Sequence, residues 1–167
     1  MPPSPSDELV DITDESGAVI GMATRREVRA RNLPHRCTYI LVFNSRGELF
    51  IHQRTATKDV HPSYWDVAVG GVVSAGESFD ESAHRELLEE LGVDATPQPL
   101  FPFRYADGRT VVHAMAYRLT HDGPFRFQPE EVARGEFVLV ADLERLFAER
   151  RFCPDGLEVW REFERNR

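Results

Sequence analysis

The segment Gly71–Val93 reads GVVSAGESFDESAHRELLEELGV and contains the strongest helix pattern in the chain. Within it, Ser78–Leu91 places apolar side chains at helical spacing along one face: Phe79, Ala83, Leu87, Leu88 and Leu91. Gly92 follows at the position where helices commonly end in a left-handed residue. We therefore expect a helix over 78–91 that packs this face on a core and follows a glycine-rich loop.

Carboxylates occupy another face of the same helix. Glu86, Glu89 and Glu90 are spaced i, i+3 and i+4, so their side chains are neighbours, and like charges at this spacing repel. Arg85 can reach Glu89, whereas Glu86 and Glu90 have no evident cationic partner nearby in the sequence. Taken alone, such a cluster is most often a solvated acidic helix face. The functional alternative is a site for Mg²⁺, which prefers oxygen ligands.

The spacing around these carboxylates favours the functional alternative. Read outward, the order is Gly71, five residues, Glu77, seven residues, Arg85-Glu86-Leu87, one residue, Glu89-Glu90, one residue and Gly92-Val93. This fills every defined position of the pattern G-x5-E-x7-R-E-U-x-E-E-x-G-U, with U aliphatic, so the chain resembles the Nudix superfamily. The resemblance implies an α/β (α+β) domain, an α/β/α sandwich around a mixed β-sheet. It also implies hydrolysis of a phosphoanhydride bond in nucleoside di- or triphosphates, or in another nucleoside diphosphate linked to a second group.

The resemblance also implies roles for individual residues. Glu86, Glu89 and Glu90 match metal ligands for Mg²⁺, with Mn²⁺ as a substitute, and the backbone carbonyl of Gly71 can join them. Arg85 and Glu77 match a salt bridge that holds the loop against the helix, so Arg85 supports catalysis through positioning.

The general base is left open among three glutamates. Glu131 is the first choice, Glu130 the second and Glu89 the third. The first two resemble a loop that carries the base in several members of the superfamily. A surface acidic turn is the competing interpretation, because a base must reach the proton that it removes.

Substrate contacts are expected from the residues that flank the glutamates in the fold. Arg54 ends a strand that faces the site in similar proteins and is the expected phosphate contact, with Lys58, Arg36 and Arg104 as alternates. Gly70 and Gly71 let the backbone approach a ligand, since neither has a Cβ. Three aromatic residues could stack on a base but are more often core: Phe101, Phe103 and Tyr105.

The remaining sequence predicts strands before and after the central helix, then helices at the end. Hairpins are expected at 10–13 with 18–22, 38–44 with 48–54, and 100–105 with 110–119. Single strands are expected at 65–73 and 137–140, and helices at 24–32, 141–149 and 157–165. Residues 1–7, rich in proline and serine, are expected to be a flexible tail, and 8–167 a single domain.

Composition excludes several functional classes. The chain has 167 residues and a net charge of −8, which disfavours nucleic acid as a partner. The two cysteines form no metal-binding motif, and no apolar run approaches the roughly 18 residues of a membrane span. We expect a soluble, cytoplasmic protein, a monomer or homodimer, whose partner is a small nucleotide.

Other members of the superfamily supply the rival hypotheses. His35, Trp65 and much of the chain resemble isopentenyl-diphosphate isomerase, but Gly70 and Val72 stand where that enzyme has a catalytic cysteine and a metal-binding histidine. A non-catalytic nucleotide-binding module is disfavoured by the complete set of carboxylates. An RNA-decapping enzyme is disfavoured by the acidic charge.

Overall fold

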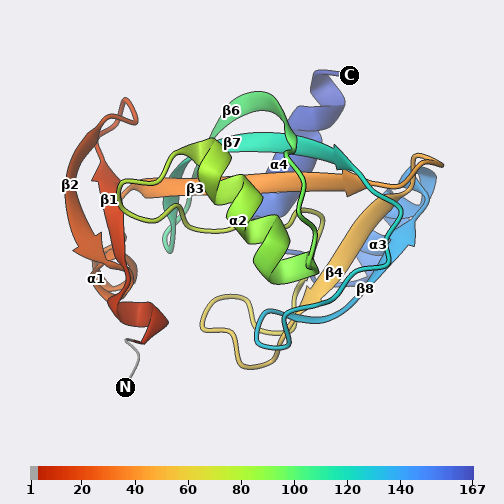
Figure 1. The fold of residues 1–167 in the computed structure, drawn as a ribbon, viewed down its shortest axis with the longest axis horizontal. Helices are drawn as coiled ribbons and strands as arrows, with labels where there is room; N and C mark the ends of the chain where they lie inside the picture. Colours follow the sequence, from red (N-terminus) through yellow and green to blue (C-terminus); the bar gives the residue numbers. More distant parts are fainter. Residues whose placement is uncertain (1–3) are drawn as a thin grey trace.

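The computed structural model describes residues 4–167 as one eight-stranded mixed sheet with helices on both faces (Figure 1). The strands are β1 (Leu9–Thr13), β2 (Val19–Thr24), β3 (His35–Phe43), β4 (Leu49–Arg54), β5 (Trp65–Asp66), β6 (Gln98–Ala106), β7 (Val111–Thr120) and β8 (Val132–Val138). The helices are η1 (Pro5–Asp7), α1 (Arg25–Arg31), α2 (Phe79–Leu91), η2 (Val140–Asp142), α3 (Leu143–Glu149) and α4 (Pro154–Arg165). The architecture is α+β, as the sequence predicts.

Strand β3 is the centre of the sheet. It pairs in parallel with β7 from His35↔Val112 to Phe43↔Thr120, and β7 pairs antiparallel with β6. Its sequence HRCTYILVF is buried at eight of nine positions. A near-continuous apolar run of this kind is typical of a strand covered on both faces.

Strands β3 and β4 diverge from a single pairing point and leave a wedge between them. They pair only at Phe43↔Leu49, after which β4 continues along β8 and β5 (Figure 1). The chain from 65 to 73 crosses this wedge. It pairs with β4 at His52↔Asp66 and then bridges to β3 at Ile40↔Val69 and Cys37↔Val72.

The strand expected over 65–73 is therefore wrong in extent, since only Trp65–Asp66 form a ladder strand. The segment changes partner partway along, and Gly70 interrupts it with a φ of +136°. A Cβ on Gly70 would lie 2.2 Å from the carbonyl oxygen of Thr38. Only glycine can bring the backbone this close to β3 in this conformation.

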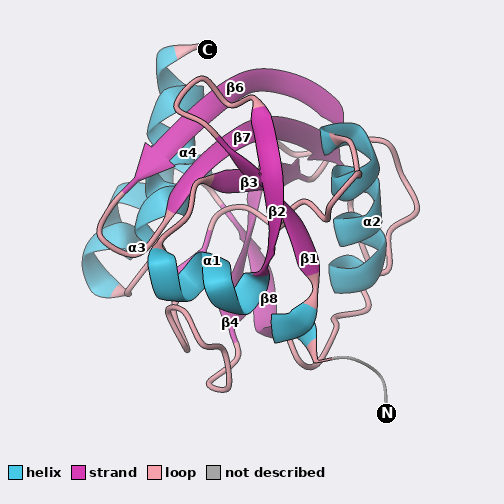
Figure 2. Ribbon diagram, turned by 90° about the vertical axis from the view of Figure 1, so that its left-hand side faces the viewer, coloured by secondary structure: helices cyan, strands magenta, loops and turns pink. Residues whose placement is uncertain are grey.

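The helices cover the two faces separately. Helix α2 packs with Ile40, Val42 and Phe50, whereas α3 and α4 pack on the other face with Leu41 and Phe43. Figure 2 shows α2 on one side of the strands and α3 and α4 on the other. A third, smaller core lies beneath α1 and joins it to the β1–β2 hairpin.

Most other boundaries follow the sequence signals. Helix α2 starts at a capping box between Ser78 and Glu81 and ends at left-handed Gly92. Helix α1 is capped by Thr24 and ends at left-handed Asn32. The first and third expected hairpins are present, whereas the strands of the second pair only at Phe43↔Leu49. None of the helices in residues 4–167 is both long and apolar enough to cross a membrane.

Three boundaries at the C-terminal end differ from those expected. Strand β8 begins at Val132 and not at 137, because its ladder with β4 includes the polar stretch Arg134-Gly135-Glu136, which lacks an apolar alternation. Helix α4 begins at Pro154, whose fixed φ suits the first helical turn. Helix α3 begins at Leu143, after the short η2 turn. In the tail, Pro5–Asp7 form one 3₁₀ turn, and residues 1–3 lie outside the described range, where flexibility stays a prediction.

Candidate active site

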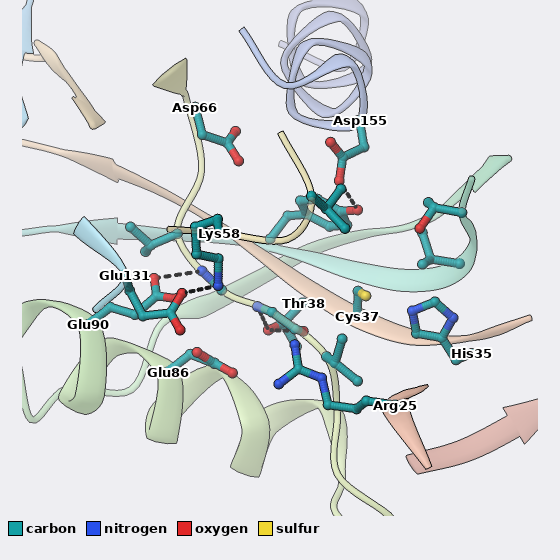
Figure 3. A pocket seen from close by; sticks show the side chains of 18 of the residues that line it. Arg25, His35, Cys37, Thr38, Lys58, Asp66, Glu86, Glu90, Glu131 and Asp155 are labelled. Carbon is teal, nitrogen blue, oxygen red and sulfur yellow. Dashed lines mark hydrogen bonds and ion pairs between the residues drawn. The ribbon is translucent and has the colours of Figure 1, made fainter. Parts of the chain in front are cut away.

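A cavity of about 360 Å³ opens in the wedge between β3 and β4. It extends from the carboxylates of α2 to the first turn of α4 (Figure 3). Nine residues expected from the sequence line it: Arg54, Lys58, Gly70, Gly71, Arg85, Glu86, Glu89, Glu90 and Glu131. Residues far apart in the chain are therefore brought together at one site.

Helix α2 holds two of its carboxylates in the cavity wall. Glu86 and Glu90 are one turn apart and only 8% and 7% exposed. The backbone N–H of Gly70 donates to Glu90 Oε2 at 3.3 Å. Gly71 faces the other carboxylate, because a Cβ there would lie 3.0 Å from Glu86 Oε1. The two glycines thus allow the loop to lie directly against the acidic face of α2.

The negative charges of buried Glu86 and Glu90 are not balanced by nearby positive charge in the described part of the chain. Burial raises the pKa of Glu86 to about 7, although Arg85 opposes the shift. It raises the pKa of Glu90 well above its ordinary value, and the neighbouring charges of Glu86 and Glu131 raise it further. Within residues 4–167 only Glu86 has an arginine partner, so the two buried carboxylates need additional positive charge to be ionised together.

Arg85 fixes the loop to the helix. Its guanidinium donates to both oxygens of Glu77, at 2.8 and 2.9 Å, so the salt bridge expected from the sequence is present. Glu77 also accepts from the backbone N–H of Ser74 at 3.1 Å. Burial opposes the charge on Glu77, but these hydrogen bonds outweigh it and lower the pKa. Arg85 also reaches Glu86 and Glu89, each at 3.2 Å.

The three base candidates lie in different surroundings. Glu131 lines the cavity and accepts from Lys58 Nζ at 2.5 Å. Glu89 also lines it, but its side chain is 47% exposed and is directed to Arg85. Glu130 is exposed and does not line the cavity, although its backbone carbonyl accepts from Thr55 Oγ1 at 3.0 Å. Position alone therefore favours Glu131 over Glu130.

The expected phosphate contacts are already engaged within the protein. Arg54 donates to the Val60 carbonyl at 2.9 and 3.2 Å, and Lys58 to Glu131. Arg36 is outside the cavity and bonds Asp11 at 2.7 Å. Arg25, in contrast, lines the cavity, and its one ion pair within residues 4–167 is a long one to Glu8, at 3.6 Å.

The aromatic residues considered for base stacking do not line the cavity. Phe101, Phe103 and Tyr105 pack against the core beside α4. Arg104, the other alternate phosphate contact, is also outside the cavity lining. These side chains belong to β6, which lies beyond β7 and away from the wedge.

Among the cavity residues that the sequence does not predict are Tyr39, Asp66 and Asp155. Asp66 and Asp155 are 89 positions apart, so no local motif links them. The one available signal is that Asp66 interrupts an otherwise apolar strand pattern, and a charge at such a position is seldom buried without a partner.

The carboxylate oxygens at this site fit a hard divalent cation in part. No group of three His, Cys, Asp or Glu side chains within residues 4–167 is assembled to hold a metal ion, since Glu89 and Glu131 are turned to Arg85 and Lys58. Glu86 and Glu90 nevertheless supply two close, buried carboxylates, and Mg²⁺ typically takes one or two carboxylates plus waters and substrate phosphates.

The backbone carbonyl oxygens of Gly70 and Gly71, which could act as metal ligands, differ in their hydrogen bonding. The Gly71 carbonyl accepts from Thr38 N at 2.9 Å. No hydrogen bond to the Gly70 carbonyl is formed within residues 4–167, so its oxygen has both lone pairs available.

Comparison with known proteins agrees with this geometry. The family model described as the NUDIX domain matches residues 33–155. An uncharacterized Nudix hydrolase of Streptomyces coelicolor is 45% identical over 161 residues, covering 94% of this chain and 88% of the relative. The crystal structure of DR0079 from Deinococcus radiodurans is 28% identical with a TM-score of 0.80, covering 93% of this chain and 98% of that one.

A more distant structure shares the fold. It is the NUDIX domain of Shewanella oneidensis NrtR complexed with ADP ribose, 16% identical with a TM-score of 0.62, covering 86% of this chain and 99% of that one. The helix, the loop, the carboxylates and these matches lead to one assignment: the chain belongs to the Nudix family of hydrolases.

Proposed function

We propose that the protein is a Mg²⁺-dependent pyrophosphohydrolase that cleaves a phosphoanhydride bond of a nucleoside di- or triphosphate, or of another nucleoside diphosphate linked to a second group. The observation that carries this proposal is the buried pair Glu86 and Glu90 at the wall of a cavity large enough for a ligand, where Arg85 pairs with Glu86 and no ion pair to Glu90 is formed within residues 4–167. The complex of the NrtR domain with ADP ribose supports a ligand of this chemical class.

The residues that would hold the cation are Glu86 and Glu90, together with Glu89 and a backbone carbonyl of Gly70 or Gly71. When bound, the divalent ion neutralises the phosphates and lowers the pKa of a water. Glu86 and Glu90 are held in place for this task, because α2 is capped at both ends and Arg85 ties it to the loop.

Glu131 is the proposed general base. Its carboxylate lies in the cavity beside Lys58, so movement of the Lys58 ammonium to a substrate phosphate would free Glu131 to accept a proton from water. Exchange of one ion pair for another keeps the charge of Lys58 compensated. Glu89 is the alternative within reach of the same cavity, and its release from Arg85 would be required.

Isomerase chemistry is the second candidate, because both His35 and Cys37 line the cavity. Burial raises the pKa of the Cys37 thiol, which makes it a weak proton donor. At Gly70, where the isomerase has its catalytic cysteine, a Cβ would clash with Thr38. These two features favour hydrolysis over isomerisation.

The cellular location, the partner and the oligomeric state are proposals. We infer a cytoplasmic location, which the free, buried thiols of Cys37 and Cys153 support. A small nucleotide is the proposed partner, and the protein is a monomer or homodimer.

The proposal is tested by incubating the protein with nucleoside di- and triphosphates, dinucleoside polyphosphates and nucleotide sugars, with Mg²⁺ or with EDTA. We expect cleavage only with Mg²⁺ or Mn²⁺, and the ratio of phosphate to pyrophosphate identifies the bond that breaks. Absence of phosphoanhydride cleavage, together with conversion of isopentenyl diphosphate to its isomer, would favour the isomerase.

A further inference from the structure

The cavity has a second polar end, opposite the carboxylates of α2. Asp66 and Asp155 lie on one side of it, and Glu86, Glu90 and Glu131 lie on the other (Figure 3). The proposed hydrolysis uses the α2 end, so the groups at the α4 end have no role in it.

Asp66 is placed at this end by β5 and by close packing against α4. It is 8% exposed, and Oδ1 accepts from the backbone N–H of Ala68 at 3.3 Å. A Cβ on Gly156 would lie only 2.1 Å from Asp66 Oδ1, so the glycine makes room for the carboxylate. The backbone N–H of Val67 and the thiol of Cys153 also lie within hydrogen-bonding reach of the Asp66 carboxylate.

Asp155 lies in the first turn of α4 and accepts a hydrogen bond from a tyrosine hydroxyl. Tyr39 donates its O–H to Asp155 Oδ2 at 2.7 Å and is only 7% exposed. Within the described residues Asp155 has no ion-pair partner. Burial, followed by the charge of Asp155, raises the pKa of Asp66 to about 7, although the charge of Arg54 opposes the shift.

His35 adds a further acceptor along the same face of β3 as Tyr39. It is 6% exposed, and its Nδ1 lies 3.0 Å from the carbonyl oxygen of Leu33. A carbonyl can only accept, so Nδ1 carries the proton and Nε2 is the unprotonated nitrogen. His35 lines the cavity, and no hydrogen bond to its Nε2 is formed within residues 4–167.

The carboxylates of Asp66 and Asp155 therefore present hydrogen-bond acceptors to the cavity at the α4 end (Figure 3). An ionised carboxylate only accepts hydrogen bonds, and a buried acceptor left unpaired is costly. The complementary ligand is a group with adjacent O–H or N–H donors. A phosphate directly beside Asp66 and Asp155 is disfavoured, because it would bring negative charge to two carboxylates.

We propose that Asp66 and Asp155, with Tyr39 and His35, form a recognition subsite for the donor-bearing end of the substrate, either the vicinal hydroxyls of a sugar or the N–H edge of a nucleobase. This inference rests on the proposed function, because the other end of the same molecule would carry the phosphates to α2. Asp66 and Asp155 contact the ligand, and Tyr39 positions Asp155.

The subsite is tested by calorimetric titration of nucleoside monophosphates into the intact protein, which does not require hydrolysis, at about pH 8.5, where Asp66 with its pKa of about 7 is ionised. The variants are Asp66→Asn, Asp155→Asn and Tyr39→Phe, with Asp142→Asn as the control, since its side chain is 43% exposed at the start of α3. We expect the first two variants to weaken the tightest monophosphate at least tenfold, because a charged acceptor is lost. Tyr39→Phe should weaken monophosphate binding less, and Asp142→Asn should bind monophosphates as wild type does. The affinity for inorganic phosphate should be the same in all variants.

Two substrate series identify the donor group. The 2′,3′-dideoxy forms lack the sugar hydroxyls, and replacing guanine with hypoxanthine removes an exocyclic amino group. The modification that removes the contacted donor should weaken wild-type binding and have little further effect in Asp66→Asn, because the two changes delete the same interaction.

Wild-type affinity retained in both Asp66→Asn and Asp155→Asn would overturn the subsite, as would monophosphates that bind no better than inorganic phosphate. Failure of the proposed function is seen separately, as absence of anhydride cleavage by a protein that still binds these ligands.

Discussion

Glu131 is the residue on which the proton-transfer part of the account depends. It lies in the cavity, whereas its neighbour Glu130 is exposed outside it. The two adjacent glutamates therefore form a matched pair for a mutational test.

We expect Glu131→Gln to lower kcat by about 10²–10⁴-fold at saturating Mg²⁺, the usual effect of losing a general base. Glu130→Gln should retain nearly full activity. Steady-state rates of phosphate release measure both. If Glu130→Gln were the impaired variant, or if Glu131→Gln were fully active, the base would have to be assigned elsewhere, first to Glu89.

Asp66 gives a prediction about stability and pH. Burial raises its pKa to about 7, from 3.8 for an unperturbed side chain. Between about pH 4 and pH 7 the folded chain holds a proton that the unfolded chain has lost, so its contribution to stability is present below pH 4 and is lost as the pH rises to 7. Asp66→Asn should therefore be more stable than wild type at neutral pH, by up to about 4 kcal/mol.

This advantage should shrink toward pH 4, where both forms are neutral at position 66. Urea unfolding at pH 4, 5.5 and 7.5 measures it, with Asp142→Asn as an exposed control that leaves the profile unchanged. A stability difference between Asp66→Asn and wild type that is constant with pH would show that Asp66 is ionised throughout.

At the scale of single elements, α2 could be predicted almost to the residue. Its apolar spacing, the Ser78–Glu81 capping box and Gly92 are all local signals, and the helix spans Phe79–Leu91. The glutamates could be placed on one face for the same reason. The segment 65–73 could not, because its course depends on β3 and β4 diverging, which no short pattern encodes.

The same limit applies to the site. The residues of the Gly71–Val93 motif were identifiable because their spacing is fixed within 23 residues. Asp66, Asp155 and Tyr39 come from three elements and meet only after the sheet has formed. The burial of Phe101 on the core likewise depends on how β6 packs beside α4.

The crossing segment yields a prediction about Gly70. Gly70→Ala should lower the free energy of unfolding by about 3 kcal/mol or more, since it combines an unfavourable φ with a clash against Thr38. Gly47→Ala is the control, because it also has positive φ, at +78°, but open space around it. Chemical denaturation compares the two, and equal losses would contradict the close approach of Gly70 to β3.

At the scale of the whole molecule, the fold places two halves of the sheet on either side of one cavity. One half carries β3 and β7, the other β4 and β8, and the loop from 65 to 73 joins them across the wedge. The acidic motif from α2 lies at one end of this cavity and the first turn of α4 lies at the other. The net charge of −8 disfavours an anionic ligand, so binding of phosphates requires the cation that the account assigns to Glu86 and Glu90.

The most direct test of that assignment is the Mg²⁺ dependence of nucleotide hydrolysis in wild type, Glu86→Gln and Glu90→Gln, with exposed Glu144→Gln on α3 as the control. We expect both α2 variants to lose at least about 100-fold in kcat/KM while keeping a cooperative unfolding transition, since each removes a ligand of the ion that stabilises the transition state. The control should match wild type. Wild-type turnover and Mg²⁺ dependence in both Glu86→Gln and Glu90→Gln would contradict the account.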